Sequence, residues 1–140
     1  MTDKSKRPMF VEKSFTVKTY DIDFAGHVSN IVYIRWLEDL RFQMLEEHLP
    51  LKPQMEQGYA PILARTNIQY KRAIRLFEPV IGQLWVQNVG AARIILASHI
   101  MVNNEICADV VQEGVFADLA TGRPMRVPAE MRHLVEHWGE

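Results

Sequence analysis

The chain has 140 residues, of which 48% are hydrophobic, and its 16 Lys and Arg residues against 17 Asp and Glu residues leave a formal net charge of -1 at pH 7. This length fits one domain, so we expect residues 1–140 to fold as a single unit. A nearly neutral chain has no overall field that attracts nucleic acid or an anionic lipid surface. We therefore expect neither nucleic-acid binding nor membrane insertion.

Cysteine use and hydropathy bear on the compartment. Cys107 is the single cysteine, so an intramolecular disulfide is excluded. The opening residues, MTDKSKRPMF, lack the apolar core and cleavage site of a secretory signal. No apolar run approaches the roughly 18 residues that a membrane-spanning helix needs. We expect a cytoplasmic protein.

The N-terminal part of the chain predicts one strand and one turn. Residues 9–20 alternate imperfectly between apolar and charged side chains, which favours a strand. The polar stretch DIDFAGHVSN follows at residues 21–30, and its Asp, Gly, Ser and Asn residues are typical of turns.

A long helix is predicted over residues 30–48, which contain no Gly or Pro. Apolar side chains recur there at helical spacing, at Tyr33, Leu37, Leu40 and Met44. Further apolar residues widen this stripe at its start: Ile31, Val32, Ile34 and Trp36. We therefore expect the first half of the helix to be buried on most sides. Ser29 or Asn30 can cap its start, and two prolines and a glycine in residues 49–58 end it.

Four strands are predicted in the second half of the chain, over residues 61–71, 79–89, 92–102 and 105–119. Residues 88–92 and 102–105 have the composition of hairpin turns. In the first of these strands, alternation predicts one apolar face, made by Ile62, Ala64, Ile68 and Tyr70. A short helix is predicted after Pro128.

This order of elements indicates an α+β fold. A curved antiparallel sheet of about five strands, wrapped around one long central helix and followed by a short C-terminal helix, buries both kinds of element most simply. Residues 93–101 are apolar on both faces of their strand, and one helix cannot cover both. Either the C-terminal helix covers the second face or another copy of the chain does. We expect the second, in a homodimer or homotetramer.

Several kinds of site fit the DIDFAGHVSN turn poorly. Asp21 and Asp23 resemble the start of a magnesium-dependent phosphatase loop, but that chemistry needs a parallel sheet with crossover helices, which the run of strands after residue 60 lacks. His27 has no second ligand at metal-binding spacing. His133 and His137 lack the Glu of a metalloprotease motif and are expected to form an exposed polar face.

The remaining possibility is a carboxylate placed beside a helix start. No nucleophile elbow or Walker-type glycine loop is present, and Cys107 lies within a predicted strand without an adjacent base. A helix N-terminus offers unpaired N–H groups that can stabilise an oxyanion, and Asp23 just upstream is a candidate base or nucleophile. Gly26 gives the turn backbone freedom or lets a substrate approach closely. The structural alternative is that Asp23 simply bonds nearby backbone N–H groups.

The segment YDIDFAGHVSNIVYIRWLEDLR, residues 20–41, resembles a family motif. It is similar to D-x-D-x-x-G-H-V-x-N-x-x-Y-x-x-W/F-x-E, the motif of the 4-hydroxybenzoyl-CoA thioesterase-like branch of the hotdog-fold acyl-CoA thioesterases, and the match has no gap. Residues 61–86 are more loosely similar to the family's second and third strands. The resemblance implies a hotdog fold, an active dimer with the acyl pocket at the subunit interface, no metal and no cofactor.

The resemblance also implies roles for single residues. Asp23 is expected to attack the thioester or to activate a water, and the backbone amide of Asn30 to polarise the carbonyl. His27 is a further candidate in the catalytic turn, where it either orients the turn or lines the pocket. Candidate substrate contacts lie around the helix start and in a basic cluster for CoA phosphates: Gly26, Val28, Tyr33, Lys71, Arg72 and Arg75. The structural alternatives are a core aromatic for Tyr33 and a solvated strand end for the cluster.

The sequence therefore predicts an acyl-CoA thioesterase that hydrolyses the thioester of a fatty or aromatic acyl-CoA, or of an acyl-carrier protein. Two alternatives stay open. One is a non-catalytic acyl-binding or CoA-binding protein on the same fold, since a fold does not dictate chemistry. The other is a hotdog enoyl hydratase or dehydratase with His27 as base, although those enzymes resemble a different motif, D-x-N-P-x-H.

Overall fold

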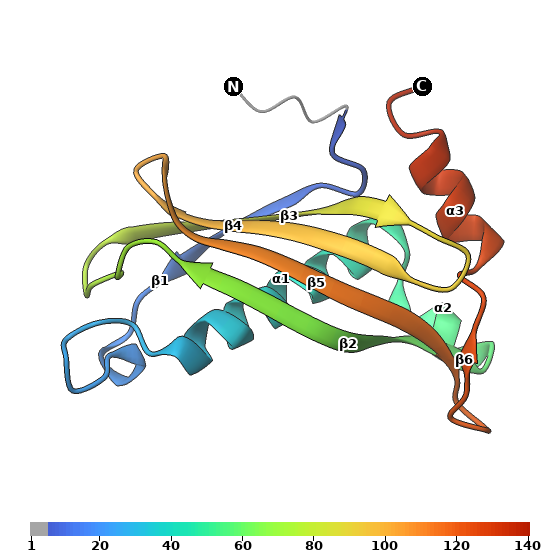
Figure 1. Ribbon diagram of the computed structural model, residues 1–140, viewed down its shortest axis with the longest axis horizontal. Helices are drawn as coiled ribbons and strands as arrows, with labels where there is room; N and C mark the ends of the chain where they lie inside the picture. The colour runs from blue at the N-terminus through green and yellow to red at the C-terminus, as the bar shows by residue number, and fades with distance from the viewer. Residues whose placement is uncertain (1–5) are drawn as a thin grey trace.

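The computed structural model describes residues 6–140, and Figure 1 shows how its elements are arranged. Residues 1–5, where the opening segment begins, lie outside the described residues. In chain order the elements are β1 (Val11–Thr16), the 3-10 helix η2 (Thr19–Asp21), α1 (Asn30–His48), α2 (Leu51–Glu56), β2 (Tyr59–Tyr70), β3 (Pro79–Val89), β4 (Ile94–Val102), β5 (Glu105–Asp118), β6 (Pro124–Met125) and α3 (Ala129–Glu136). The predicted order of one strand, a long helix, four strands and a short helix is confirmed.

The strands form one antiparallel sheet in the order β1-β3-β4-β5-β2, with β6 paired to the end of β5. Helix α1 runs across one face of this sheet, so that helix and sheet bury each other (Figure 1). Among the described residues, β1 and β2 are the two edge strands. The predicted α+β hotdog architecture is confirmed, and the two-residue β6 adds a sixth strand to the expected five.

The core lies between α1 and the sheet. The residues that predicted the helix are all buried: Tyr33, Leu37, Leu40 and Met44. The helix comes close to β3 at Gly82, where a Cβ atom would lie 2.8 Å from Leu40 Cδ1 and 2.8 Å from Phe15 Cε2. Because glycine has no Cβ, the two layers can approach to this distance.

Helix α1 is less enclosed than the sequence predicts. Ile31 and Ile34 are 56% and 42% exposed, so the expected burial on most sides of the first half is wrong for these two residues. The reason is that only one side of the helix packs on the sheet. With Phe42, which is 54% exposed, they are the large apolar residues that α1 exposes, and we call them the open α1 face (Ile31, Ile34 and Phe42).

Strand β2 contains a bulge that reverses one predicted face. The register shifts between Leu63 and Arg65, so Ala64 is the extra residue. Ile62 pairs with Val115 and Ile68 with Val110, which point to opposite sides of β5. The prediction that Ile62 and Ala64 share a face with Ile68 and Tyr70 is therefore wrong, because one extra residue turns the following side chains over.

The sequence predicted the turn between β4 and β5 but not helix α2. The turn at Asn103 and Asn104 has φ angles of 48° and 67°, as expected of a two-residue hairpin turn. Helix α2 was not predicted, because residues 49–58 contain two prolines. Pro53 lies in the first turn of α2, where its missing N–H removes no bond within the helix.

Over residues 6–140, no helix combines the length and the apolar character needed to cross a membrane.

Candidate active site

The turn between η2 and α1 is closed by short backbone hydrogen bonds. The Asp23 N–H donates to the His27 carbonyl at 2.8 Å, and the Gly26 N–H donates to the Asp23 carbonyl at 3.0 Å. Gly26 has a φ of +78°, in the left-handed region that favours glycine. The Val28 N–H bonds to the Ile74 carbonyl at 2.8 Å, which ties the turn to the β2–β3 loop.

Asp21 has a structural role in this turn. Its side chain is buried, and its Oδ2 accepts a hydrogen bond from the Lys18 N–H at 2.8 Å. Its carbonyl accepts a bond from the Ser29 N–H at 2.8 Å. Asp21 therefore joins η2 to the start of α1 and is not a free carboxylate.

Asp23 is exposed and is held by the turn itself. Its Oδ1 accepts hydrogen bonds from the Ala25 N–H at 2.9 Å and from the His27 N–H at 3.3 Å. The local bonding that sequence reasoning left as a structural alternative is thus present for one oxygen. Oδ2 has no hydrogen-bond donor within residues 6–140, so it remains available to a substrate or a water.

A cleft of about 230 Å³ opens beside this carboxylate, and we call it the turn cleft. Its lining includes most of the predicted site residues, together with two others: Asp23, His27, Val28, Asn30, Tyr33, Tyr70, Lys71, Arg72 and Ala73. Gly26 and Arg75 are not in the lining. Tyr70 was not foreseen as a site residue, and its position directly before the basic cluster was the only signal in the sequence.

The start of α1 supplies an amide to the turn cleft. Asn30 is the first residue of the helix, and Ser29 makes no side-chain capping hydrogen bond. The first N–H groups of a helix have no partner within the helix, and the helix dipole makes this end partly positive. The Asn30 amide can therefore donate to an oxygen on which negative charge develops.

Two tyrosines form the inner wall of the turn cleft. Tyr33 is 2% exposed, and its ring lies edge-on to Tyr70 and Trp36, with centroids 5.1 Å and 5.6 Å away. Burial raises the pKa of Tyr33 to about 12, so its hydroxyl stays neutral at physiological pH. Tyr33 is both a core aromatic and part of the cleft wall.

Arg72 in the predicted basic cluster is engaged by other protein groups. Its guanidinium donates to both carboxylate oxygens of Glu78, at 3.0 Å and 2.6 Å, and to the Ala73 carbonyl at 2.8 Å. Its Nε also lies 3.0 Å from Glu105 Oε1. The hydrogen bonds to Glu78 raise the pKa of Arg72 above its ordinary value. These partners leave little of the guanidinium for a phosphate.

The other two cations of the cluster differ in position. Lys71 is exposed and lines the turn cleft. Arg75 is exposed but lies outside the lining, and its backbone N–H donates to Glu78 Oε1 at 2.8 Å. Lys71 is therefore the cation best placed to meet an anionic ligand in the cleft.

Two other kinds of chemistry find no support in the side chains. Cys107 is buried, and burial raises the pKa of its thiol, so the reactive thiolate is disfavoured. Within residues 6–140, no group of three or more His, Cys, Asp or Glu side chains is arranged to hold a metal ion.

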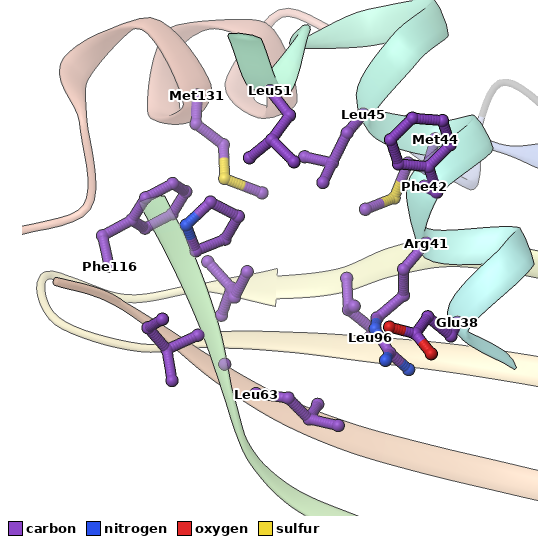
Figure 2. Close-up of a pocket in the computed structure, with 14 residues that line it drawn as sticks. Glu38, Arg41, Phe42, Met44, Leu45, Leu51, Leu63, Leu96, Phe116 and Met131 are labelled. Atoms are coloured by element: carbon purple, nitrogen blue, oxygen red, sulfur yellow. The ribbon is translucent and has the colours of Figure 1, made fainter. Parts of the chain in front are cut away.

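A larger cavity lies at the other end of α1. It has a volume of about 310 Å³ and is lined by the second half of α1, α2, the start of β2, β4, β5 and α3 (Figure 2). Most of its lining is apolar, including Leu45, Phe116 and Met131, and two charged residues, Glu38 and Arg41, also reach it. We call it the apolar pocket. Sequence reasoning missed it, because its walls come from segments far apart in the chain.

Known proteins share this fold over nearly the whole chain. The protein is 25% identical, over 128 residues, to the long-chain acyl-CoA thioesterase FadM of Escherichia coli. The match covers 90% of this chain and 97% of FadM. The crystal structure of YbaW, a probable thioesterase from Escherichia coli, superposes with a TM-score of 0.82 at 24% identity and covers 92% of this chain and 98% of its own. SAV2348 from Staphylococcus aureus, solved in complex with CoA, gives a TM-score of 0.84 at 16% identity, over 95% and 85% of the two chains.

The family assignment rests on the sequence itself. Residues 17–135 match the sequence model of the thioesterase-like superfamily. The match covers well over half of the chain. The matched region contains the turn, all of α1 and strands β2 to β6, whereas β1 lies just before it. The family resemblance of residues 20–41 is thereby confirmed, and the chain belongs to the thioesterase-like superfamily.

Proposed function

We propose that this protein is an acyl-CoA thioesterase, with residues 1–140 acting as one catalytic domain. The observation that carries the proposal is that the Asp23 carboxylate and the Asn30 end of α1 line the same cleft. The names of relatives add support: FadM is a long-chain acyl-CoA thioesterase, and SAV2348 was solved in complex with CoA.

In the proposed reaction, the thioester carbonyl lies in the turn cleft with its oxygen at the Asn30 N–H. Asp23 Oδ2 either attacks the carbonyl carbon, or removes a proton from a water that attacks it. In the first route the C–S bond breaks, CoA leaves as a thiolate, and water hydrolyses the acyl-aspartate anhydride. Both routes consume one water and release the carboxylic acid and the CoA thiol. The Asn30 amide stabilises the oxyanion that develops in either route.

Other cleft residues have supporting roles in this proposal. Lys71 offers a point charge to a CoA phosphate, whereas Arg72 shapes the loop through its bonds to Glu78. The N–H groups of Ala25 and His27 hold Asp23 Oδ1, and in this proposal Oδ2 acts on the thioester or the water. Gly26 permits the tight turn, and Val28 and Tyr33 form the apolar floor and wall.

We further propose that the active form is a homodimer. Strand β2 is an edge of 12 residues, and edge strands of this length readily pair with another chain. Ile62 and Leu63 on it are 46% and 40% exposed, and the open α1 face adds further apolar surface. Antiparallel pairing of β2 with β2 of a second copy covers the β2 edge and the open α1 face, and it gives a closed two-fold dimer.

Such a dimer brings two cavities together. Tyr70 at one end of β2 lines the turn cleft, while Ile62 near the other end lines the apolar pocket. A two-fold axis near the middle of β2 would put the turn cleft of one copy beside the apolar pocket of its partner. A thioester held in one copy can then extend its acyl chain into the other.

The test is Asp23→Asn, measured by release of free thiol from short, medium, long and aromatic acyl-CoAs. Asparagine keeps an oxygen for the bonds from Ala25 and His27 but is neither a base nor a nucleophile. We expect kcat to fall by about 10²- to 10⁴-fold with unchanged folding, while Asp39→Asn on the exposed side of α1 retains full activity. An unchanged kcat in Asp23→Asn would reject the assignment of Asp23.

The same preparation separates the alternatives. Saturable binding of CoA esters with no thiol release from any of them would indicate a non-catalytic binding protein. Loss of the enoyl absorbance of crotonyl-CoA without thiol release would indicate a hydratase. Either result would overturn the thioesterase proposal.

A further inference from the structure

The apolar pocket has the size and lining of a site for an alkyl chain. Its volume of about 310 Å³ has room for a chain of roughly ten methylene groups, if each takes ~30 Å³, the volume of one water. Leu45, Leu96 and Met131 supply apolar surface from three different elements. A purely apolar chain, however, does not account for the whole of this wall.

Arg41 is the exception in the wall of the apolar pocket. Figure 2 shows its side chain and that of Glu38 extending from α1 toward the strands, at the end of the pocket away from Phe116 and Met131. The Nη1 atom of Arg41 is buried and has no hydrogen-bond acceptor within residues 6–140. Burial lowers the pKa of Arg41, and the charge of Glu38 opposes this shift. A buried donor without an acceptor is costly, so a ligand oxygen here gains affinity.

We propose that the apolar pocket binds a hydroxylated acyl chain, whose hydroxyl oxygen accepts a hydrogen bond from Arg41 Nη1 and whose hydroxyl hydrogen is donated to the Glu38 carboxylate. This inference rests on the proposed thioesterase function and specifies its substrate class. Arg41 and Glu38 are binding residues in it and take no part in breaking the thioester.

The charges of Arg41 and Glu38 favour a hydroxyl over a carboxylate as the oxygen group of the bound chain. Arginine can only donate hydrogen bonds and an ionised glutamate can only accept them, whereas a hydroxyl does both. A chain ending in a carboxylate satisfies Arg41 but meets the like charge of Glu38. An unsubstituted chain buries Arg41 Nη1 without an acceptor. Sites that bind a hydroxyl in this way reject the analogue that lacks it.

The test compares acyl-CoAs of equal carbon number: dodecanoyl-CoA, its β-hydroxy and ω-hydroxy derivatives, and the ω-carboxy derivative. We expect kcat/KM to be at least about tenfold higher for one of the hydroxylated chains than for dodecanoyl-CoA, and the ω-carboxy chain to be no better than dodecanoyl-CoA. Equal kcat/KM values for hydroxylated and plain chains in the wild-type protein would overturn the inference, and this test needs no variant.

Variants then assign the preference to Arg41. Arg41→Met keeps the length of the side chain but removes the donors, and we expect the ratio of hydroxylated to plain kcat/KM to fall to near one. Arg35→Met, at an exposed position of α1, is the matched control and should keep the ratio. If Arg41→Met keeps the ratio but breaks up the oligomer in light scattering, Arg41 pairs with the second copy and the inference is wrong.

Direct binding separates this inference from the proposed function. Calorimetry of the wild-type protein with free dodecanoate and with its hydroxylated forms needs no turnover. If no acyl-CoA is hydrolysed but the hydroxylated acids still bind at least tenfold more tightly, the thioesterase proposal fails and the ligand assignment stands. If hydroxylated and plain acyl-CoAs are hydrolysed equally well, the thioesterase proposal stands and the ligand assignment fails.

Discussion

The carboxylate of Glu78 accepts two hydrogen bonds from the Arg72 guanidinium, of 3.0 Å from Nη1 to Oε1 and 2.6 Å from Nη2 to Oε2. Arg72 follows β2 and Glu78 precedes β3, so the pair closes the loop that borders the turn cleft. Bidentate pairing of this kind fixes geometry as well as charge. The loop that carries Lys71 is therefore held in shape by Arg72, and the two adjacent cations have different surroundings: Arg72 is paired with carboxylates, whereas Lys71 is exposed.

The loss of stability caused by Glu78→Gln should depend on pH in a defined way. The hydrogen bonds from Arg72 lower the pKa of Glu78 in the folded protein. A lowered folded pKa stabilises the protein above the unfolded value, near 4.3 for glutamate, and this contribution is lost as the pH falls through the folded pKa. We expect Glu78→Gln to lower Tm at pH 7 and the difference from wild type to shrink below about pH 4. A difference that persists unchanged at low pH would contradict this explanation.

Lys71→Ala should weaken the binding of CoA and leave the chemical step intact. We expect KM for acyl-CoA to rise several-fold with kcat nearly constant, and the rise to shrink at high salt, because an exposed charge pair is screened. KM for an acyl-pantetheine thioester, which lacks the nucleotide phosphates, should not change. Arg75→Ala is the control on the same loop, and a larger KM effect there than in Lys71→Ala would show that the phosphates lie elsewhere.

A charge on the open α1 face should separate the two copies. We expect Ile34→Glu to run as a monomer in light scattering and to lose most thioesterase activity, because the acyl pocket of each cleft belongs to the partner in the proposed dimer. Leu119→Lys removes an equally exposed apolar side chain, 46% against 42% exposed, in the β5–β6 turn. It should leave the mass and the activity unchanged, and an Ile34→Glu protein that stays dimeric would place the interface elsewhere.

Gly26→Ala tests the backbone of the turn that carries Asp23, the proposed catalytic residue. No atom lies within 4 Å of the position of the added Cβ, so the cost comes only from holding alanine at a φ of +78°. This strain is about 1 to 2 kcal/mol. Gly122→Ala has a φ of +72° and equally open surroundings, in the loop between β5 and β6. Both variants should lose similar stability in urea unfolding, but only Gly26→Ala should also lower kcat, because the turn that holds Asp23 relaxes.

Gly82→Ala tests the contact between α1 and β3. The added Cβ lies 2.8 Å from side-chain atoms of both Leu40 and Phe15, so these buried side chains or the layers that carry them must shift. We expect a loss of about 1 to 3 kcal/mol, typical of overpacking, measured by urea unfolding. At Gly90 the nearest atom to the added Cβ is the Arg93 carbonyl oxygen at 3.5 Å, an ordinary contact. Gly90→Ala should therefore cost much less, and equal losses would contradict the packing argument.

The sequence by itself determined the features that depend on local spacing. The bounds of α1 at Asn30 and His48 follow from a run without Gly or Pro and from apolar side chains at helical intervals. The nearness of Asp23 to the start of that helix follows as well, because seven residues and a tight turn cannot carry them far apart. Both of these depend on interactions between neighbours in the chain.

Only the tertiary structure decided which distant residues meet. The bulge at Ala64 reversed the face of Ile62, and no single side chain marks a bulge in advance. Arg72 was equivalent to Lys71 in the sequence until the fold put it beside Glu78 and Glu105. The apolar pocket, with the buried Nη1 of Arg41 in its wall, is built from six elements and exists only once the sheet packs over α1. Local periodicity sets the elements, whereas strand register and packing set their partners.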